Sequence, residues 1–173
     1  MDARITLENV HTFSVPLSQH SLRWIFEQED SPLSAEFQDQ IVPLTAEAAR
    51  FLWNFRSPEH YVGSFDEMGK YFKEHAGLAN KSRDNQQLKK WLYARGIPFD
   101  RKVFWSTQPE EAFVLSWKMV IKFSARLFFA NDEVIWDKSL NWVLVYDHND
   151  VFHFGRQPKF NIETHSQPAD RTS

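Results

Sequence analysis

Aromatic side chains supply much of the apolar material of this sequence, which contains 16 Phe, 7 Trp and 4 Tyr among 173 residues. Each buried ring removes about 150 to 250 Å² of surface from water, so we expect these rings to dominate the hydrophobic core. The chain has no Cys, which excludes disulfides, thiolate catalysis and thiolate zinc sites. A chain of this length buries roughly two thirds of its unfolded surface. We therefore expect an aromatic core that needs neither a disulfide nor a metal to fold.

The first half of the chain predicts mainly helices. An alternating apolar pattern over residues 5–15 predicts one strand, which Pro16 ends. Helix-capping residues then precede four runs that carry apolar side chains. These capping residues are Ser18, Thr45, Ser64 and Asp84. Gly77 and Gly96 stand where a residue in the left-handed conformation would end the third and fourth of these helices.

The segment from Phe113 to Phe129 fits two periods at once. Every odd position in it is apolar, which favours a strand, while polar side chains at helical spacing favour a helix. These polar residues are Glu111, Lys118, Lys122 and Arg126. A strand of about seventeen residues would far exceed the usual length, and no turn residue interrupts the run. We therefore predict a buried helix from about Gln108 to Phe123, followed by a strand through Phe129.

The remainder of the second half predicts strands. Residues 101–106 are rich in β-forming side chains, and three further short runs predict a meander. These runs are Glu133 to Trp136, Asn141 to Tyr146 and Asp150 to Phe154. The predicted class is α+β, with a helical first half packed on a C-terminal antiparallel or mixed β-meander with one buried helix. No repeat or linker divides the chain, so we expect a single α+β domain over 1–156 and an extended polar C-terminal tail over 157–173.

The formal net charge is only −3, but the charge is unevenly distributed along the chain. Residues 1–80 carry 6 Lys and Arg against 12 Asp and Glu, residues 81–130 carry 10 against 4, and residues 131–173 carry 4 against 7. A basic middle between acidic flanks has two interpretations. Oppositely charged segments can face each other within one fold, or the basic segment can form an anion-binding face.

The basic character is strongest over residues 81–102, where seven Lys and Arg face two Asp. Cations interleaved with aromatic rings are typical of a face that contacts phosphates and stacks on bases. The candidate ligand-binding or partner-binding residues are Lys89, Lys90, Trp91, Arg95, Arg101 and Lys102. The alternative interpretation places Trp91 in the core and the two adjacent Lys on the solvated side of an amphipathic helix.

The sequence shows no motif for catalysis, for a cofactor or for a metal. With five Gly in all, it contains neither a phosphate-binding loop nor a G-x-G-x-x-G fingerprint. His148 and His153 have no third ligand at a diagnostic spacing, so we predict no metal site. Glu110 and Glu111 are adjacent and do not face a common point, which argues against an acid and base pair. We therefore predict no catalytic residue and no cofactor.

No segment of the sequence is predicted to cross a membrane. The longest mainly apolar stretch, Ala112 to Ala130, is interrupted by Ser, Lys and Arg, and cations are costly at the centre of a bilayer. The first residues lack the basic start and apolar run of a secretory signal. Together with the absence of Cys, these features favour a cytoplasmic protein.

Two parts of the sequence resemble a family of small gammaproteobacterial proteins of unknown function. The residues that carry the resemblance read RKVFWSTQPEEAFVLSWKMVIKFSARLFFANDEVIW and VLVYDHNDVFHFGR in the second half, and RWIFEQEDSPLS and IVPLTAEAARFLWN in the first. The similarity covers most of residues 22–156. It implies a bacterial, cytoplasmic protein. It implies no site residue, since these are aromatic and turn positions.

The missing catalytic motifs, the acidic first half and the surplus of Trp favour a non-enzymatic binding module that acts through protein contacts. A self-associating adaptor and an immunity-type protein that masks a basic partner are examples. The first alternative is a nucleic-acid or anionic-ligand binder that uses residues 81–102. The second is an enzyme with a site that carries no motif. We also expect Phe160 and Ile162 to anchor the tail, either on its own domain or on a second copy in a homodimer.

Overall fold

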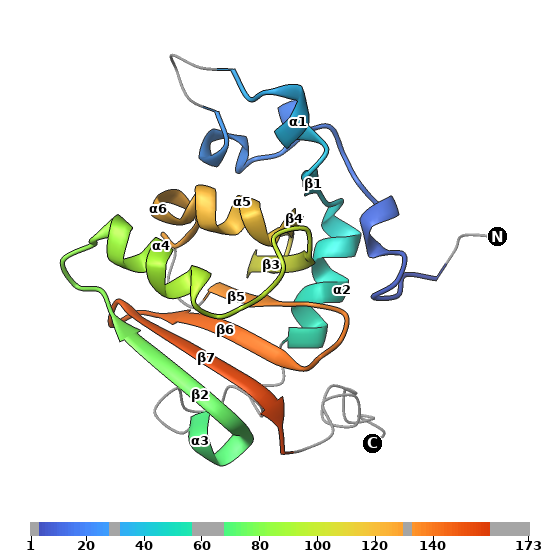
Figure 1. The fold of residues 1–173 in the computed structure, drawn as a ribbon. Coiled ribbons are helices and arrows are strands. Elements are labelled where there is room, and N and C mark those ends of the chain that lie inside the picture. Colours follow the sequence, from blue (N-terminus) through green and yellow to red (C-terminus); the bar gives the residue numbers. More distant parts are fainter. Residues whose placement is uncertain (1–3, 28–31, 57–67, 130–132, 160–173) are drawn as a thin grey trace, which may run out of the picture.

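The computed structural model describes residues 4–27, 32–56, 68–129 and 133–159, and it confirms the predicted α+β class (Figure 1). The strands are β1 (Ile41–Pro43), β2 (Phe72–Ala79), β3 (Lys102–Gln108), β4 (Glu111–Ser116), β5 (Glu133–Trp136), β6 (Trp142–Asp147) and β7 (Val151–Pro158). The α-helices are α1 (Ala35–Gln38), α2 (Ala46–Arg56), α3 (Met68–Tyr71), α4 (Asn85–Tyr93), α5 (Trp117–Lys122) and α6 (Ser124–Leu127). Short 3-10 helices are η1 (Val10–Thr12), η2 (Leu17–Gln19) and η3 (Arg23–Ile25).

The strands form one sheet in the order β1-β4-β3-β5-β6-β7-β2, and all neighbouring pairs are antiparallel. β5, β6 and β7 form the predicted meander. β2 belongs to the first half of the chain, yet it pairs with β7 from Phe72 opposite Pro158 to Ala79 opposite Val151. Figure 1 shows these two strands side by side. The sheet therefore joins the two halves of the chain.

Apolar side chains fill the core on both faces of the sheet. On one face, Trp105 and Phe113 belong to a buried cluster that includes Trp117 of α5, and α4, α5 and α6 lie along this face (Figure 1). On the other face, Phe104 belongs to a second cluster with Leu52 of α2. Successive residues of β3 thus point to opposite sides, as the period of a strand requires.

Two predicted helices and their caps are confirmed. Thr45 Oγ1 accepts a hydrogen bond from the Ala48 amide at 3.2 Å, at the start of α2. Asp84 Oδ1 accepts from the Gln86 and Gln87 amides at 3.0 and 3.1 Å, at the start of α4. Beyond the end of α4, Gly96 has a φ of +70°, the left-handed conformation that Gly adopts without strain.

The prediction of a helix from Gln108 to Phe123 is wrong in its first half. The chain makes a hairpin between β3 and β4, and α5 begins only at Trp117. Ser116 marks the change, because its Oγ accepts from the Met119 amide at 3.2 Å and caps α5. The strand period therefore applies to β4 and the helical period to α5, one after the other along the chain. The strand predicted through Phe129 is also wrong, since α6 occupies Ser124–Leu127.

Three predictions for the first half are also wrong. Residues 5–15 contain turns and η1 instead of a strand, apart from an isolated bridge between Ser14 and Leu44. The run after Ser18 forms short 3-10 helices. The helix predicted to end at Gly77 is the short α3 followed by β2, because β2 finds a full-length partner in β7. The predicted cap at Ser64 lies outside the described residues.

The predicted boundary between domain and tail falls inside β7, which continues to Pro158. Pairing with β2 explains the extra residues, since Phe72 lies opposite Pro158. Phe160 and Ile162 lie outside the described residues, so their anchoring stays a prediction. In the part of the chain that the structure describes, no helix has the length and apolar character needed to cross a membrane.

Candidate functional site

The basic segment is divided by the end of α4. Lys89, Lys90 and Trp91 lie on α4, and Arg95 follows it directly. Lys90 is exposed, while Lys89, Trp91 and Arg95 are half-buried. The second group is Arg101 and Lys102, at the turn that leads into β3 and at its first residue. The structure therefore separates the six predicted residues into two groups.

The first group contains a pair of arginines that we call the arginine pair, Arg95 and Arg156. Arg156 lies on β7, and its Nη2 donates a hydrogen bond to the carbonyl oxygen of Arg95 at 2.5 Å. Arg95 Nε donates to the carbonyl oxygen of Trp91 at 3.0 Å. The guanidinium carbon of Arg95 lies 4.4 Å from the centre of the Trp91 ring, and that of Arg156 lies 5.2 Å from the centre of the Phe154 ring. Backbone carbonyls and aromatic rings thus hold both side chains in place.

The arginine pair has no acidic partner in the part of the chain that the structure describes, because no carboxylate there forms an ion pair with Arg95 or Arg156. Burial and, secondarily, the positive charge of Arg156 lower the pKa of Arg95. An anion placed between the two guanidinium groups would relieve this repulsion and could accept charge-assisted hydrogen bonds from both.

Trp91 supports the arginine pair and does not present a free ring. It packs on Phe152, with ring centres 6.1 Å apart, and it lies beside the buried cluster under α4. The guanidinium carbon of Arg95 lies over the Trp91 ring, 4.4 Å from its centre. Trp91 therefore combines both sequence interpretations, because it contacts the core and also positions a cation.

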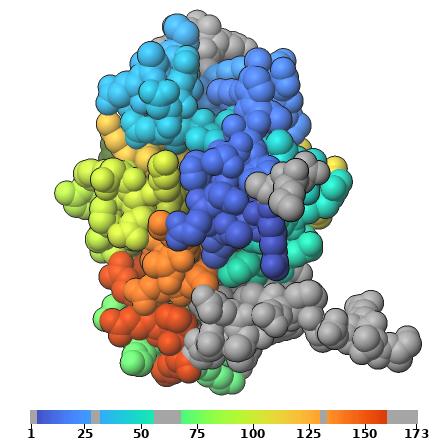
Figure 2. Space-filling view, turned by 90° about the vertical axis from the view of Figure 1, so that its right-hand side faces the viewer, coloured from blue at the N-terminus to red at the C-terminus, as the bar shows by residue number. Residues whose placement is uncertain are grey.

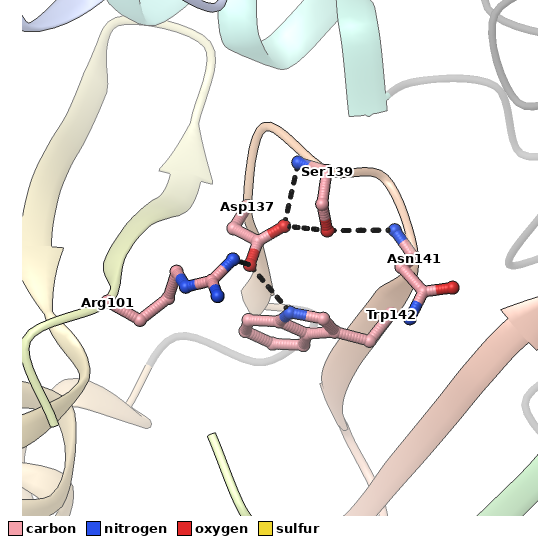
Figure 3. Close-up of polar contacts among 5 residues, drawn as sticks. All are labelled: Arg101, Asp137, Ser139, Asn141 and Trp142. Carbon is pink, nitrogen blue, oxygen red and sulfur yellow. Dashed lines mark hydrogen bonds and ion pairs between the residues drawn. The ribbon is translucent and has the colours of Figure 1, made fainter. Parts of the chain in front are cut away.

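Arg101 is engaged in a buried network around Asp137 (Figure 3). The Asp137 side chain is only 1% exposed, and its Oδ2 accepts from Arg101 Nη1 at 3.2 Å and from Trp142 Nε1 at 2.8 Å. Its Oδ1 accepts from the amide of Ser139 at 2.8 Å and from the Ser139 hydroxyl. Each carboxylate oxygen is therefore satisfied, and Arg101 ties the turn before β3 to the β5–β6 turn.

Aromatic stacking connects this network to the arginine pair. The ring of Trp142 stacks on Phe154 with centres 5.9 Å apart and planes inclined by 29°. Phe154 in turn lies under Arg156 and 5.6 Å from the guanidinium carbon of Arg95. The arginine pair therefore rests on packed aromatic rings, and side chains held in this way would lose less entropy on binding a ligand.

Lys102 lies between two neighbouring cavities on the side of the sheet that α2 covers in part. One cavity has a volume of about 300 Å³ and is lined mainly by apolar groups, among them Val42 and Phe99. The other has a volume of about 540 Å³ and is lined by residues of the amino-terminal segment, the turn before β3 and the β5–β6 turn. Figure 2 shows these three segments meeting on one face of the molecule. Val114 and Lys102 line both cavities.

Exposed aromatic rings adjoin the smaller cavity. Tyr93 is 65% exposed and Phe99 is 50% exposed, and their ring centres lie 5.6 Å apart. Most large apolar side chains of the described residues are buried, so this pair is an unusual surface feature. It is of the kind that anchors protein contacts.

The Glu and His residues that the sequence analysis considered for catalysis or metal binding have separate partners among the described residues. Glu110 pairs with Arg50, and Glu111 accepts from the Ser21 hydroxyl at 2.5 Å. His153 Nε2 lies 2.9 Å from Asp147 Oδ2, and no group of three His, Asp or Glu suited to a metal is present in the ranges that the structure describes.

Sequence reasoning missed Arg156 and Asp137. Arg156 carried a usable signal, because it follows Phe152 and Phe154 at the spacing of one face of a strand. Its proximity to Arg95, 61 positions earlier in the chain, depends on the packing of α4 over β7 and has no local signal. Comparisons with protein-family models, with curated proteins and with solved structures find no match to this chain.

Proposed function

We propose that this chain is a binding module whose arginine pair holds an anionic ligand. The observation that carries the proposal is that the guanidinium carbons of Arg95 and Arg156 lie 5.6 and 5.2 Å from the centre of the same Phe154 ring, and that neither arginine has an ion-pair partner in the described residues. Guanidinium groups bind phosphate and carboxylate oxygens in a forked geometry, and two of them can clamp one such group. The ligand class is therefore a molecule with a phosphate or a carboxylate, including the backbone of a nucleic acid.

Isothermal titration calorimetry with pyrophosphate at low salt tests this proposal. The wild-type chain is expected to bind, and Arg95→Gln or Arg156→Gln is expected to weaken binding at least about tenfold. Arg156→Lys keeps the charge but loses the forked geometry of the guanidinium group. Its affinity is therefore expected to lie between that of the wild-type chain and that of Arg156→Gln. Arg50→Gln is the matched control, because Arg50 is exposed on α2 and pairs with Glu110. Absent binding, or an equal loss in Arg50→Gln, contradicts the proposal.

A single-stranded oligonucleotide distinguishes a nucleic acid from a small anion. Each phosphate contact to a single strand lowers the logarithm of the binding constant by roughly 0.7 per decade of salt. A slope that corresponds to several contacts, and that decreases when Arg95 or Arg156 is replaced, indicates nucleic acid. Binding of pyrophosphate without binding of the oligonucleotide indicates a small anionic ligand.

A second candidate function is binding of a protein partner, and the exposed Tyr93–Phe99 pair beside an apolar cavity of about 300 Å³ favours it. Aromatic anchors of this kind often contribute most of the binding energy of an interface. The partner is expected to insert an apolar side chain into the cavity. A non-catalytic adaptor role and self-association are both forms of this candidate.

Capture from the native cell tests the second candidate when two variants are compared. Replacing Tyr93 and Phe99 together by Ser is expected to abolish capture of a specific partner, and light scattering on the same proteins reports self-association. Trp24→Ser serves as the control, since Trp24 is 47% exposed in a different segment. A partner retained by the double variant would argue against this surface.

A further inference from the structure

The sheet has two edge strands, β1 and β2, and β1 is protected from pairing with another chain. It has only three residues and ends in Pro43. The segment before η2 also covers it, because the Val15 amide donates to the Pro43 carbonyl at 3.0 Å and Ser14 forms a bridge with Leu44. Short length, proline and a covering segment are devices by which proteins prevent a sheet edge from pairing with a second molecule.

β2 lacks these devices in the part of the chain that the structure describes. It is eight residues long, contains no Pro and keeps one register with β7 from Phe72 to Ala79. Figure 1 shows it as the outermost strand of its side of the sheet. Lys73 and Glu74 lie near its start, and small residues dominate its second half. The edge is therefore long and regular enough to accept a further strand.

The backbone groups that face away from β7 belong to alternate residues of β2. The Asn80 amide donates to the Asp150 carbonyl at 2.9 Å, so the even-numbered residues direct their backbone groups toward β7. The odd-numbered residues direct theirs outward, and we call this set the β2 edge. Its members are all exposed and are Lys73, His75, Gly77 and Ala79. No described residue forms a backbone hydrogen bond to the β2 edge from outside.

A second copy of the chain presents a matching edge. When two antiparallel strands are related by a two-fold axis perpendicular to the sheet, residues equally far from the axis lie opposite each other. An axis at Ala76 places Lys73 opposite Ala79 of the second copy and His75 opposite Gly77 of the second copy. Each of these pairs can exchange two backbone hydrogen bonds. This register therefore uses every member of the β2 edge in both copies.

The charges of β2 favour the same register. With the axis at Ala76, Glu74 lies opposite Leu78 of the second copy, and neither charged residue faces its own kind. An axis at Lys73 or at Glu74 would place two like charges directly opposite each other, which is destabilising. An axis at His75 would leave Ala79 without a counterpart in the strand, since β2 begins only at Phe72.

We propose that two copies of the chain pair through the β2 edge, antiparallel and with Ala76 at the two-fold axis, so that the two sheets become one. The partner is thus a second copy of this chain. This interface uses neither Tyr93 nor Phe99, so it is distinct from the surface considered above for a protein partner.

A disulfide test reports the register directly, because the chain contains no Cys. At the axis, the two Ala76 residues form a pair without mutual backbone hydrogen bonds, whose Cα atoms lie about 4.5 Å apart and thus within disulfide range. Ala76→Cys is expected to form a covalent dimer on air oxidation. Glu74→Cys is the control, because the two Glu74 residues would lie about 14 Å apart although Glu74 is more exposed than Ala76.

Light scattering on the full chain at high micromolar concentration measures the dimer without a crosslink. Gly77→Pro removes an outward N–H that β7 does not use, so this variant is expected to keep its circular dichroism and to become monomeric. Gly77→Ala keeps that N–H and is expected to stay dimeric, since its Cβ would lie 3.6 Å from the nearest atom.

Charge changes at Ala79 test the same interface without proline. Ala79→Glu would face Lys73 of the second copy, and Ala79→Lys would place two cations opposite each other. The dimer dissociation constant of Ala79→Lys is therefore expected to exceed that of Ala79→Glu by about threefold or more. This comparison decides if Gly77→Pro does not fold.

Three results would overturn the proposal. The first is a wild-type chain that stays monomeric, and the second is equal crosslinking of Ala76→Cys and Glu74→Cys. The third is a dimer that Gly77→Pro and both Ala79 variants leave unchanged. If that dimer is instead lost when Tyr93 and Phe99 are replaced by Ser, the exposed aromatic pair forms the interface.

Discussion

Replacing Asp137 by Ala removes a carboxylate that is 1% exposed and that accepts from Arg101, Trp142 and Ser139. The buried Nε1 of Trp142 then lacks an acceptor, which costs about 1 to 3 kcal/mol. Ser139 is exposed and the Arg101 side chain is 43% exposed, so water can replace their bonds, and each adds about 1 kcal/mol or less. The free energy of unfolding is therefore expected to fall by about 1 to 5 kcal/mol.

Urea unfolding followed by circular dichroism measures this loss. The slope with urea is expected to stay constant while the midpoint falls, because the variant changes stability and not the area exposed. Asp39→Ala is the control, since Asp39 is exposed, and its effect is expected to stay within about 0.5 kcal/mol. An equally small loss for Asp137→Ala would refute the reasoning. Arg101→Gln is expected to cost less than Asp137→Ala, because water screens the exposed part of the pair.

Three further predictions concern single positions. A Cβ at Gly155 would overlap the Phe72 ring, so Gly155→Ala is expected to cost about 1 to 3 kcal/mol, whereas Gly77→Ala, whose Cβ would lie 3.6 Å from the nearest atom, is tolerated in the same urea assay. Asp84→Ala removes the α4 cap and is expected to cost about 1 kcal/mol by thermal unfolding. Burial raises the pKa of Tyr146 to about 12 from 10.0, so its contribution to stability is complete below pH 10.0 and is lost as the pH rises through about 12. Ultraviolet titration is expected to show a phenol that ionises near pH 12, and Tyr146→Phe is expected to remove this ionisation step.

Local signals predicted some elements of this fold well. The caps at Thr45 and Asp84 are side-chain hydrogen bonds to nearby amides, so the sequence contains both partners within three positions. The meander of β5, β6 and β7 was predicted because short alternating runs separated by polar turns have few other folded forms. In each case, the interaction that determines the structure is local.

Elements that depend on distant partners were predicted poorly. Phe72–Ala79 has a weak strand pattern, and it becomes β2 because β7 offers a complete row of backbone partners. In the run after Gln108, length favoured a helix, but residues up to Ser116 form β4, the second strand of a hairpin, and the Ser116 cap then starts α5. Tertiary context overrides local preference in both places.

The candidate sites show the same limit. Charge and aromatic spacing selected Trp91 and Arg95, which the structure does bring together. Their completion by Arg156 depends on a contact across 61 positions. The buried pairing of Arg101 with Asp137 spans 36 positions, and composition cannot distinguish such a structural cation from one that is free to bind a ligand.

The pairing of β2 with β7 also sets an order of events during synthesis. The ribosome makes β2 early, but its pairing partner begins only at Val151, after the other strands of the sheet have been made. Until then, the backbone groups of β2 have no neighbour on the side that β7 will occupy, and unpaired strand edges promote aggregation in nascent chains. The β2–β7 pair is therefore the last part of the sheet that can form, and a chain that stops before Pro158 leaves this pair incomplete.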